Sequence, residues 1–213
     1  MANARAVLFD FSGTLARCEA RDAWFTGTGL NGAQRAAVMD RLTHPTASVT
    51  HHAWEHRDLD PALHREAYLH VLKASGLGDE HAEQLYRRVT DPAEWALYPD
   101  TAFVLKSLRQ KGIRTAVVSN IAWDIRAVLA TAEVDEYVLS FEIGAAKPDP
   151  RIFIEALARL GVPAEQALMI GDSEENDGAA RELGCDFILV DPLPTVERPT
   201  GLIDALRERG VDL

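Results

Sequence analysis

Residues 6–14 read AVLFDFSGT, an apolar run that ends in aspartate and continues into a short polar turn. The run Ala6–Phe9 is typical of a strand that is buried on both faces of a parallel sheet. Open α/β sheets bind their ligands just outside the carboxyl ends of the strands. Asp10, the residue after the run, is therefore expected at the ligand-binding edge of such a sheet.

The composition argues against several classes of partner. The chain has 213 residues, of which 47% are hydrophobic and 26% charged, as is usual for a globular protein. Its formal net charge of −11 disfavours a surface that binds nucleic acid or an anionic membrane. A small phosphorylated substrate remains compatible with that charge, because a small anion responds to the local field of a pocket. No stretch approaches the roughly 18 apolar residues of a membrane span. We expect no nucleic-acid partner and no membrane partner.

Two features predict a cytoplasmic location. The N-terminal residues MANARAVLFD contain no apolar signal-peptide region ahead of the first strand. Cys18 and Cys185 are too few for a disulfide framework and fit a reducing compartment.

Apolar runs that alternate with helical patterns predict an α/β fold. Besides Ala6–Phe9, strands are predicted at Thr115–Val118, Tyr137–Phe141, Ala167–Ile170 and Phe187–Val190. A helix is predicted after Asp149-Pro150, because proline is favoured at the first helical position, and Gly161 ends it. Another helix follows Asp100 and ends at Gly112. This alternation indicates a Rossmann-like parallel sheet flanked by helices.

The segment 16–95 interrupts the alternation. It contains no convincing strand, and helices are predicted after Asn31 and after Asp60-Pro61. So long a helical segment cannot be a simple crossover between strands. We therefore predict a core segment of residues 1–15, a helical cap of residues 16–95 inserted after the first strand, and a core α/β domain of residues 96–213.

Four segments with chemically active side chains each follow a predicted strand. They are Asp10–Thr14, Ser119-Asn120, Lys147 within AAKPDP, and GDSEEND at residues 171–177. Each alone is a common turn or helix-start sequence. In this order, each after a strand, they resemble the four motifs of the haloacid dehalogenase-like hydrolase superfamily. The resemblance implies a helical cap of the first type over the active site.

The resemblance also implies a nucleophile and a metal site. Asp10 would attack phosphorus and form an aspartyl-phosphate. Asp10, the main-chain carbonyl of Ser12 and Asp172 would bind Mg²⁺ directly, and Asp177 would act through water.

Substrate contacts follow from the same resemblance. Lys147 would offset the charge on the nucleophile and on the phosphoryl group. Ser119, Asn120 and neighbouring backbone amides would bind the phosphoryl oxygens. Thr14 would contact or orient the nucleophile.

Ser12 departs from the pattern of the family's phosphatases. They carry a second Asp here, which serves as general acid and base, a role typically worth about 10²–10⁴-fold in rate. A serine hydroxyl is far too weak an acid to replace it. We therefore expect a preference for substrates whose leaving group needs no proton, such as acyl or aryl phosphates.

Three functions stay open at this point. A magnesium-dependent phosphohydrolase is favoured, because the chain keeps both Asp172 and Asp177. A 2-haloacid dehalogenase-type hydrolase would instead attack carbon through Asp10 without a metal. A catalytically impaired member would bind a phosphorylated ligand without turnover. The oligomeric state, monomer or homodimer, is also left open.

Histidines are confined to the predicted cap. They are His44, His51, His52, His56, His64, His70 and His81. The four-residue spacing of His52 and His56 can place two metal ligands on one helical face, although surface or hydrogen-bonded histidines are the more common case. A cap histidine that reached the active site would supply the acid that Ser12 lacks.

Overall fold

The computed structural model describes residues 4–43 and 51–213. Its α/β part holds a five-stranded parallel sheet of order β5-β4-β1-β6-β7. The strands are β1 (Ala6–Phe9), β4 (Arg114–Ser119), β5 (Glu136–Leu139), β6 (Ala167–Gly171) and β7 (Asp186–Leu189). The sheet extends from β1 in two directions, so the carboxyl end of β1 lies where the strand order reverses, the usual place for a ligand in such folds. The predicted fold class is confirmed.

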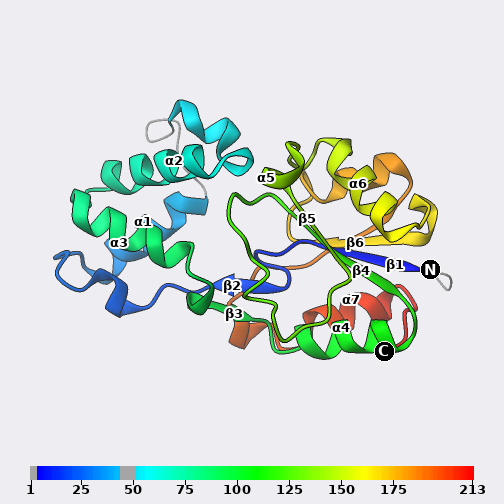
Figure 1. Ribbon diagram of the computed structural model, residues 1–213. Coiled ribbons are helices and arrows are strands. Elements are labelled where there is room, and N and C mark those ends of the chain that lie inside the picture. The colour runs from blue at the N-terminus through cyan, green and yellow to red at the C-terminus, as the bar shows by residue number, and fades with distance from the viewer. Residues whose placement is uncertain (1–3, 44–50) are drawn as a thin grey trace.

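Helices cover both faces of the sheet (Figure 1). One face packs against α4 (Thr101–Gln110) and α7 (Gly201–Glu208), and the other against α6 (Pro150–Leu160), with the one-turn α5 (Ser140–Ile143) near it. Alternate residues of β1 enter the two cores, since Val7 and Phe9 pack with α4 and α7 while Ala6 and Leu8 pack with α6. Burial on both faces explains why β1 reads as an unbroken apolar run.

Asp100 joins the two helices on one face. It precedes α4, as the sequence predicts, but its side chain does not cap that helix. Instead its Oδ2 atom accepts hydrogen bonds from the main-chain N–H groups of Leu202 (2.8 Å) and Ile203 (3.2 Å) at the start of α7. Asp100 therefore caps a helix that begins a hundred residues later in the chain.

A third apolar core lies among the residues between β2 (Ala16–Cys18) and β3 (Trp95–Leu97), which we call the helical insert. It contains α1 (Gly32–Thr43), α2 (Pro61–Ala74), α3 (Asp79–Val89) and the 3-10 helices η1 (Asp22–Phe25), η2 (His52–Leu59) and η3 (Pro92–Glu94). Its core consists of Trp24, Phe25, Val38, Leu42, Leu69, Val71, Leu72, Leu77, Ala82 and Leu85. Both predicted helices of this segment are confirmed, with Asn31 and Gln34 exchanging capping bonds at α1 and Asp60 capping α2.

The expectation that residues 16–95 contain no strand is wrong, because a short strand lies at each end of this segment. The strands β2 and β3 pair antiparallel and link the helical insert to the sheet. Three-residue strands are too short to show an alternating pattern, which is why the sequence does not reveal them. The domain boundaries at 15 and 95 fall at this ribbon and stay a prediction.

Smaller differences concern strand ends and connections. The predicted strand Tyr137–Phe141 ends at Leu139, because Ser140 begins α5. Short 3-10 helices complete the connections: η4 (Ala164–Gln166), η5 (Gly178–Leu183) and η6 (Thr195–Glu197). No helix within residues 4–43 and 51–213 has the length and apolar character needed to cross a membrane.

Candidate active site

Three of the four chemically active segments meet at the carboxyl edge of neighbouring strands. Asp10 directly follows β1, and its N–H donates to the carbonyl of Ile170 (2.9 Å), which extends the pairing with β6. Asp172 follows β6, and Ser119 is the last residue of β4. Because β1 lies between β4 and β6, the fold brings these side chains together.

Lys147 connects the fourth segment to this edge. Its ammonium group lies 2.6 Å from Oδ1 of Asp10, 2.6 Å from Oδ1 of Asp177 and 2.8 Å from the carbonyl oxygen of Val118. These contacts use all three donors of a lysine ammonium group. Only 5% of Lys147 is exposed, so the ion pairs are shielded from water.

Three carboxyl groups therefore share one positive charge. Ligand oxygens of Asp10, Asp172 and Asp177 all lie within 4.8 Å of one another. Burial raises the pKa of Asp10 to about 6, although Lys147 opposes the rise. Burial, with the charges of Asp10 and Asp177, raises the pKa of Asp172 to about 7. Burial disfavours the charged form of Lys147, but the two carboxylates outweigh it and hold the lysine pKa above its usual value.

The donor set fits a hard divalent cation. Mg²⁺ takes oxygen ligands and is usually held by one or two carboxylates together with water and phosphate oxygens. Asp10 and Asp172 offer such oxygens beside a third carboxyl group, that of Asp177, while Lys147 bonds to Asp10 and Asp177 only. The residues present therefore match the implied metal.

Two glycines let these carboxylates approach the backbone. Gly13 has a φ of +83°, and a Cβ atom at this position would lie 2.2 Å from Oδ2 of Asp172. A Cβ atom on Gly171 would lie 2.2 Å from Oδ2 of Asp177. That same Asp177 oxygen accepts the N–H of Ser173 at 3.0 Å. Any side chain at either glycine would displace a carboxylate of the site.

The remaining predicted residues differ in their surroundings. Ser12 is exposed, whereas Thr14 and Ser119 are buried. The Thr14 hydroxyl has no hydrogen-bond partner among the described residues, so it is free to receive one. Asn120 uses both ends of its side-chain amide on the main chain of Lys147, at 2.8 Å and 2.6 Å. Its side chain thus positions the lysine, and phosphoryl contacts by Ser119 and by the main chain at Asn120 stay a prediction.

Sequence analysis missed Arg198, which holds the turn after β1. Its guanidinium donates to the carbonyl oxygen of Gly13 (2.7 Å) and to that of Thr14, and it stacks on the ring of Tyr98 with 3.3 Å between Cζ and the ring centroid. Arg198 is 6% exposed. Nothing in its local sequence marks it, because its partners lie about 185 residues earlier.

The helical insert reaches the same edge of the sheet. Ser140, which follows β5, accepts the N–H of Ile121 (2.9 Å) and donates to the carbonyl oxygen of Asp58 in η2 (2.5 Å). Burial raises the pKa of the Asp58 carboxyl, and the charges of Arg57 and Lys147 oppose the rise. Lys147 therefore interacts electrostatically with the Asp58 carboxyl group of the helical insert.

No described histidine serves this site. None has a hydrogen bond or ion pair to Asp10, Lys147, Asp172 or Asp177 within the part of the chain that the structure covers, and His44 lies outside it. His64 is buried 3.1 Å from the hydroxyl of Tyr86, and burial lowers its pKa to about 4. His52 and His56 do not share a helical face, because η2 is a 3-10 helix, in which residues four apart point roughly 120° away from each other.

Sequence comparisons identify the family. The model for haloacid dehalogenase-like hydrolases matches residues 4–184. Haloacid dehalogenase-like hydrolase domain-containing protein 3 of Mus musculus is 36% identical over 118 residues, 51% of this chain and 47% of that protein. Phosphoserine phosphatase of Thermus thermophilus is 33% identical over 60% of this chain and 52% of that protein. The chain spans about half the length of these curated relatives.

One relative matches along nearly the whole chain. Ribulose-1,5-bisphosphate 5-phosphatase of Halopiger xanaduensis is 27% identical over 98% of this chain and 94% of that protein. Among solved structures, a dehalogenase with an intermediate complex is 23% identical, with a TM-score of 0.71 over 90% of this chain and 86% of that one, which shows the fold alone. The chain belongs to the haloacid dehalogenase-like hydrolases, which confirms the resemblance seen in the sequence.

Replacing Arg198 tests its hold on the turn after β1. We expect Arg198→Met to lower the free energy of unfolding by about 2–4 kcal/mol, because it leaves the buried carbonyl groups of Gly13 and Thr14 without a donor. Urea unfolding followed by circular dichroism measures the change. Arg181→Met is the matched control, since Arg181, like Arg198, makes three hydrogen bonds and stacks on a ring, but two of its bonds go to the exposed Glu174. Equal losses in the two variants would contradict the role of Arg198.

Proposed function

We propose that this member of the haloacid dehalogenase-like hydrolase family is a magnesium-dependent phosphohydrolase that acts on a small phosphorylated substrate through an aspartyl-phosphate at Asp10. The observation that carries the proposal is the buried Lys147 bridge between Asp10 and Asp177, with Asp172 within 4.8 Å of both. Relatives named as phosphatases support it. We further propose that the helical insert is the cap of this site.

Each residue has a role that its contacts support. Asp10, the main-chain carbonyl of Ser12 and Asp172 would hold Mg²⁺, which when bound supplies positive charge to the phosphoryl group and orients it. Lys147 holds Asp10 in place and supplies positive charge where the phosphoryl oxygens would bind. The Thr14 hydroxyl and the end of β4 at Ser119 offer further donors.

The reaction has two displacements. In the first, a carboxylate oxygen of Asp10 forms a bond to phosphorus as the bond to the leaving oxygen breaks. In the second, water attacks the aspartyl-phosphate, releases phosphate and restores Asp10. The first step calls for an acid that protonates the leaving group, and the second for a base that deprotonates water. The hydroxyl group of Ser12 can serve as neither.

Charge argues against the dehalogenase alternative. A metal-free attack on a haloacid would bring an anionic substrate to three carboxyl groups that share one lysine. A divalent cation removes that excess of negative charge, whereas the haloacid reaction offers nothing to balance it. The binding-only alternative uses the same groups, and turnover alone separates it from an enzyme.

A substrate panel tests the reaction class. We expect acyl and aryl phosphates to be hydrolysed with Mg²⁺ present, faster than sugar phosphates, and phosphate release to stop in chelator. Asp10→Asn should abolish activity, because an amide is not a nucleophile here. A malachite-green phosphate assay and a halide assay on 2-haloacids provide the measurements. Halide release in chelator would support the dehalogenase alternative, and Mg²⁺-dependent phosphate binding without turnover would support the binding-only one.

Restoring the missing carboxyl group tests the role of Ser12. We expect Ser12→Asp to raise kcat on sugar phosphates by about 10²-fold, the lower end of general acid–base assistance. On acyl phosphates we expect kcat to change little and KM to rise, because the added carboxylate repels the phosphoryl group. Ser12→Asn is the matched control, since it has nearly the same shape but transfers no proton. Steady-state kinetics on both substrate classes gives the comparison.

An absent gain in Ser12→Asp would mean that another group already transfers the proton. Asp58 is the candidate for that proton transfer. Its main-chain carbonyl oxygen accepts a hydrogen bond from Ser140 at the sheet edge, and its carboxyl group interacts electrostatically with Lys147. In that case Asp58→Asn should slow sugar phosphates selectively, while Glu55→Gln, an exposed carboxyl change in the same helix η2, should not.

A further inference from the structure

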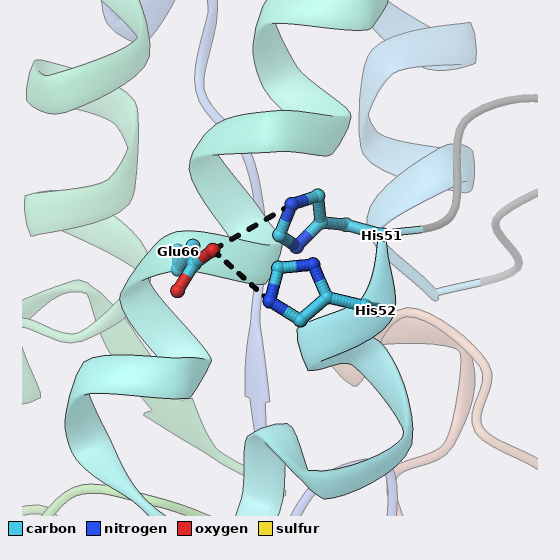
Figure 2. A group of neighbouring side chains, drawn as sticks. All are labelled: His51, His52 and Glu66. Atoms are coloured by element: carbon cyan, nitrogen blue, oxygen red, sulfur yellow. Dashed lines mark ion pairs between the residues drawn. The ribbon is translucent and has the colours of Figure 1, made fainter.

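Two histidines and a glutamate gather on the helical insert, in a group that shares no residue with the active site (Figure 2). His51 precedes η2, His52 begins it, and Glu66 lies on α2. Nε2 of His51 and Nε2 of His52 each lie 3.5 Å from Oε1 of Glu66. Figure 2 shows both rings directed at the same carboxylate.

The local backbone explains why the rings converge. The Nδ1 atom of His51 accepts the N–H of Ala53 at 3.3 Å, which caps η2 and fixes the ring. The ring of His52 lies against that of His51, with 3.8 Å between centroids. His70 follows Glu66 by one turn of α2, and its ring centroid is 4.7 Å from that of His51.

These side chains match the ligand preferences of a zinc-type ion. Two imidazole nitrogens and one carboxylate oxygen form a set found in zinc sites, with metal–ligand distances of about 2.0–2.2 Å. Two ligand atoms 3.5 Å apart that share an ion at this distance subtend about 110–120°, close to the tetrahedral angle. Water would fill the remaining position.

We propose that His51, His52 and Glu66 form a binding site for a divalent transition-metal ion such as Zn²⁺. It differs in chemistry from the active site, where the candidate ligands are all oxygens. Binding joins η2 to α2 through the ion. Metal binding at Nε2 of His51 would require the neutral ring to carry its proton on Nδ1. The 3.3 Å bond from Ala53 would then be lost, and the metal–nitrogen bond would hold the ring in its place.

Calorimetric titration of the full chain with Zn²⁺ tests the proposal. Saturating Mg²⁺ is present in all samples to compete for the active-site carboxylates, and no substrate is needed. Because the variants change only residues of the helical insert, a loss of Zn²⁺ affinity in them reports on this site whether or not the proposed phosphohydrolase reaction is correct. We expect one Zn²⁺ per chain in the wild type, and a loss of affinity of at least about tenfold in Glu66→Gln and in His52→Ala. Both residues are exposed, so both variants should fold.

His56→Ala is the matched control, because His56 is an exposed histidine of the same helix that points elsewhere. It should bind Zn²⁺ as the wild type does. Zn²⁺ should also raise the melting temperature of the wild type and of His56→Ala, but not that of Glu66→Gln. Equal affinity in all four proteins, or a loss confined to His56→Ala, would overturn the proposal.

Discussion

Three neighbouring carboxyl groups, of which Asp10 and Asp177 are buried and Asp172 is half-buried, share one ammonium group at the carboxyl edge of the sheet, and the geometry of the site depends on that shortage of positive charge. The three N–H groups of the Lys147 ammonium donate to Asp10, Asp177 and the carbonyl oxygen of Val118, so none is left to donate to Asp172. Burial is the main cause of the raised pKa values of Asp10 and Asp172, and the charges of the neighbouring carboxyl groups add to the rise. A protein can keep such a cluster only if a cation or protons offset it. This makes the cluster a place for chemistry on an anion rather than a device for stability.

The surrounding structure fixes this cluster mainly through the main chain. Asn120 binds both the N–H and the carbonyl group of Lys147, so the lysine stem starts from a set position. Arg198 holds the carbonyl groups of Gly13 and Thr14 from the far end of the chain. Gly13 and Gly171 leave the space that two carboxylates occupy. Bonds to main-chain atoms locate a turn whatever side chains it carries, so this framework is compatible with substitution at Ser12.

The sequence predicts this site well wherever the signal is local. Continuous apolar runs mark β1 and β6, and a residue that directly follows a buried parallel strand has few other places to lie. Proline and glycine mark both ends of α6, and Asp60-Pro61 marks the start of α2. Prediction fails where the partner is remote or the helix type changes. Arg198 and the side chain of Asp100 act on residues about 185 and a hundred positions away, and no local pattern encodes that. The prediction that His52 and His56 share a helical face assumes 3.6 residues per turn, whereas η2 is a 3-10 helix with three residues per turn. The side chain that His52 approaches, Glu66, lies instead on another helix.

Serine at position 12 has an electrostatic consequence besides the loss of a general acid, because it adds no negative charge to the site. Three ionised carboxylates, one ammonium group and one divalent cation are together electrically neutral, so under the proposed function the site would accept a phosphate dianion without prior excess charge. A fourth carboxylate at position 12 would add proton transfer but also a negative charge next to Asp10 whenever it is ionised. Substrates with a good leaving group gain nothing from the proton and lose from the charge, so for them serine is the better residue. Substrates with a poor leaving group gain more from protonation of that group than they lose from the extra negative charge of the site. Under the proposed function, the residue at position 12 therefore sets a balance between the range of leaving groups and the affinity for the phosphoryl group, and serine would favour affinity.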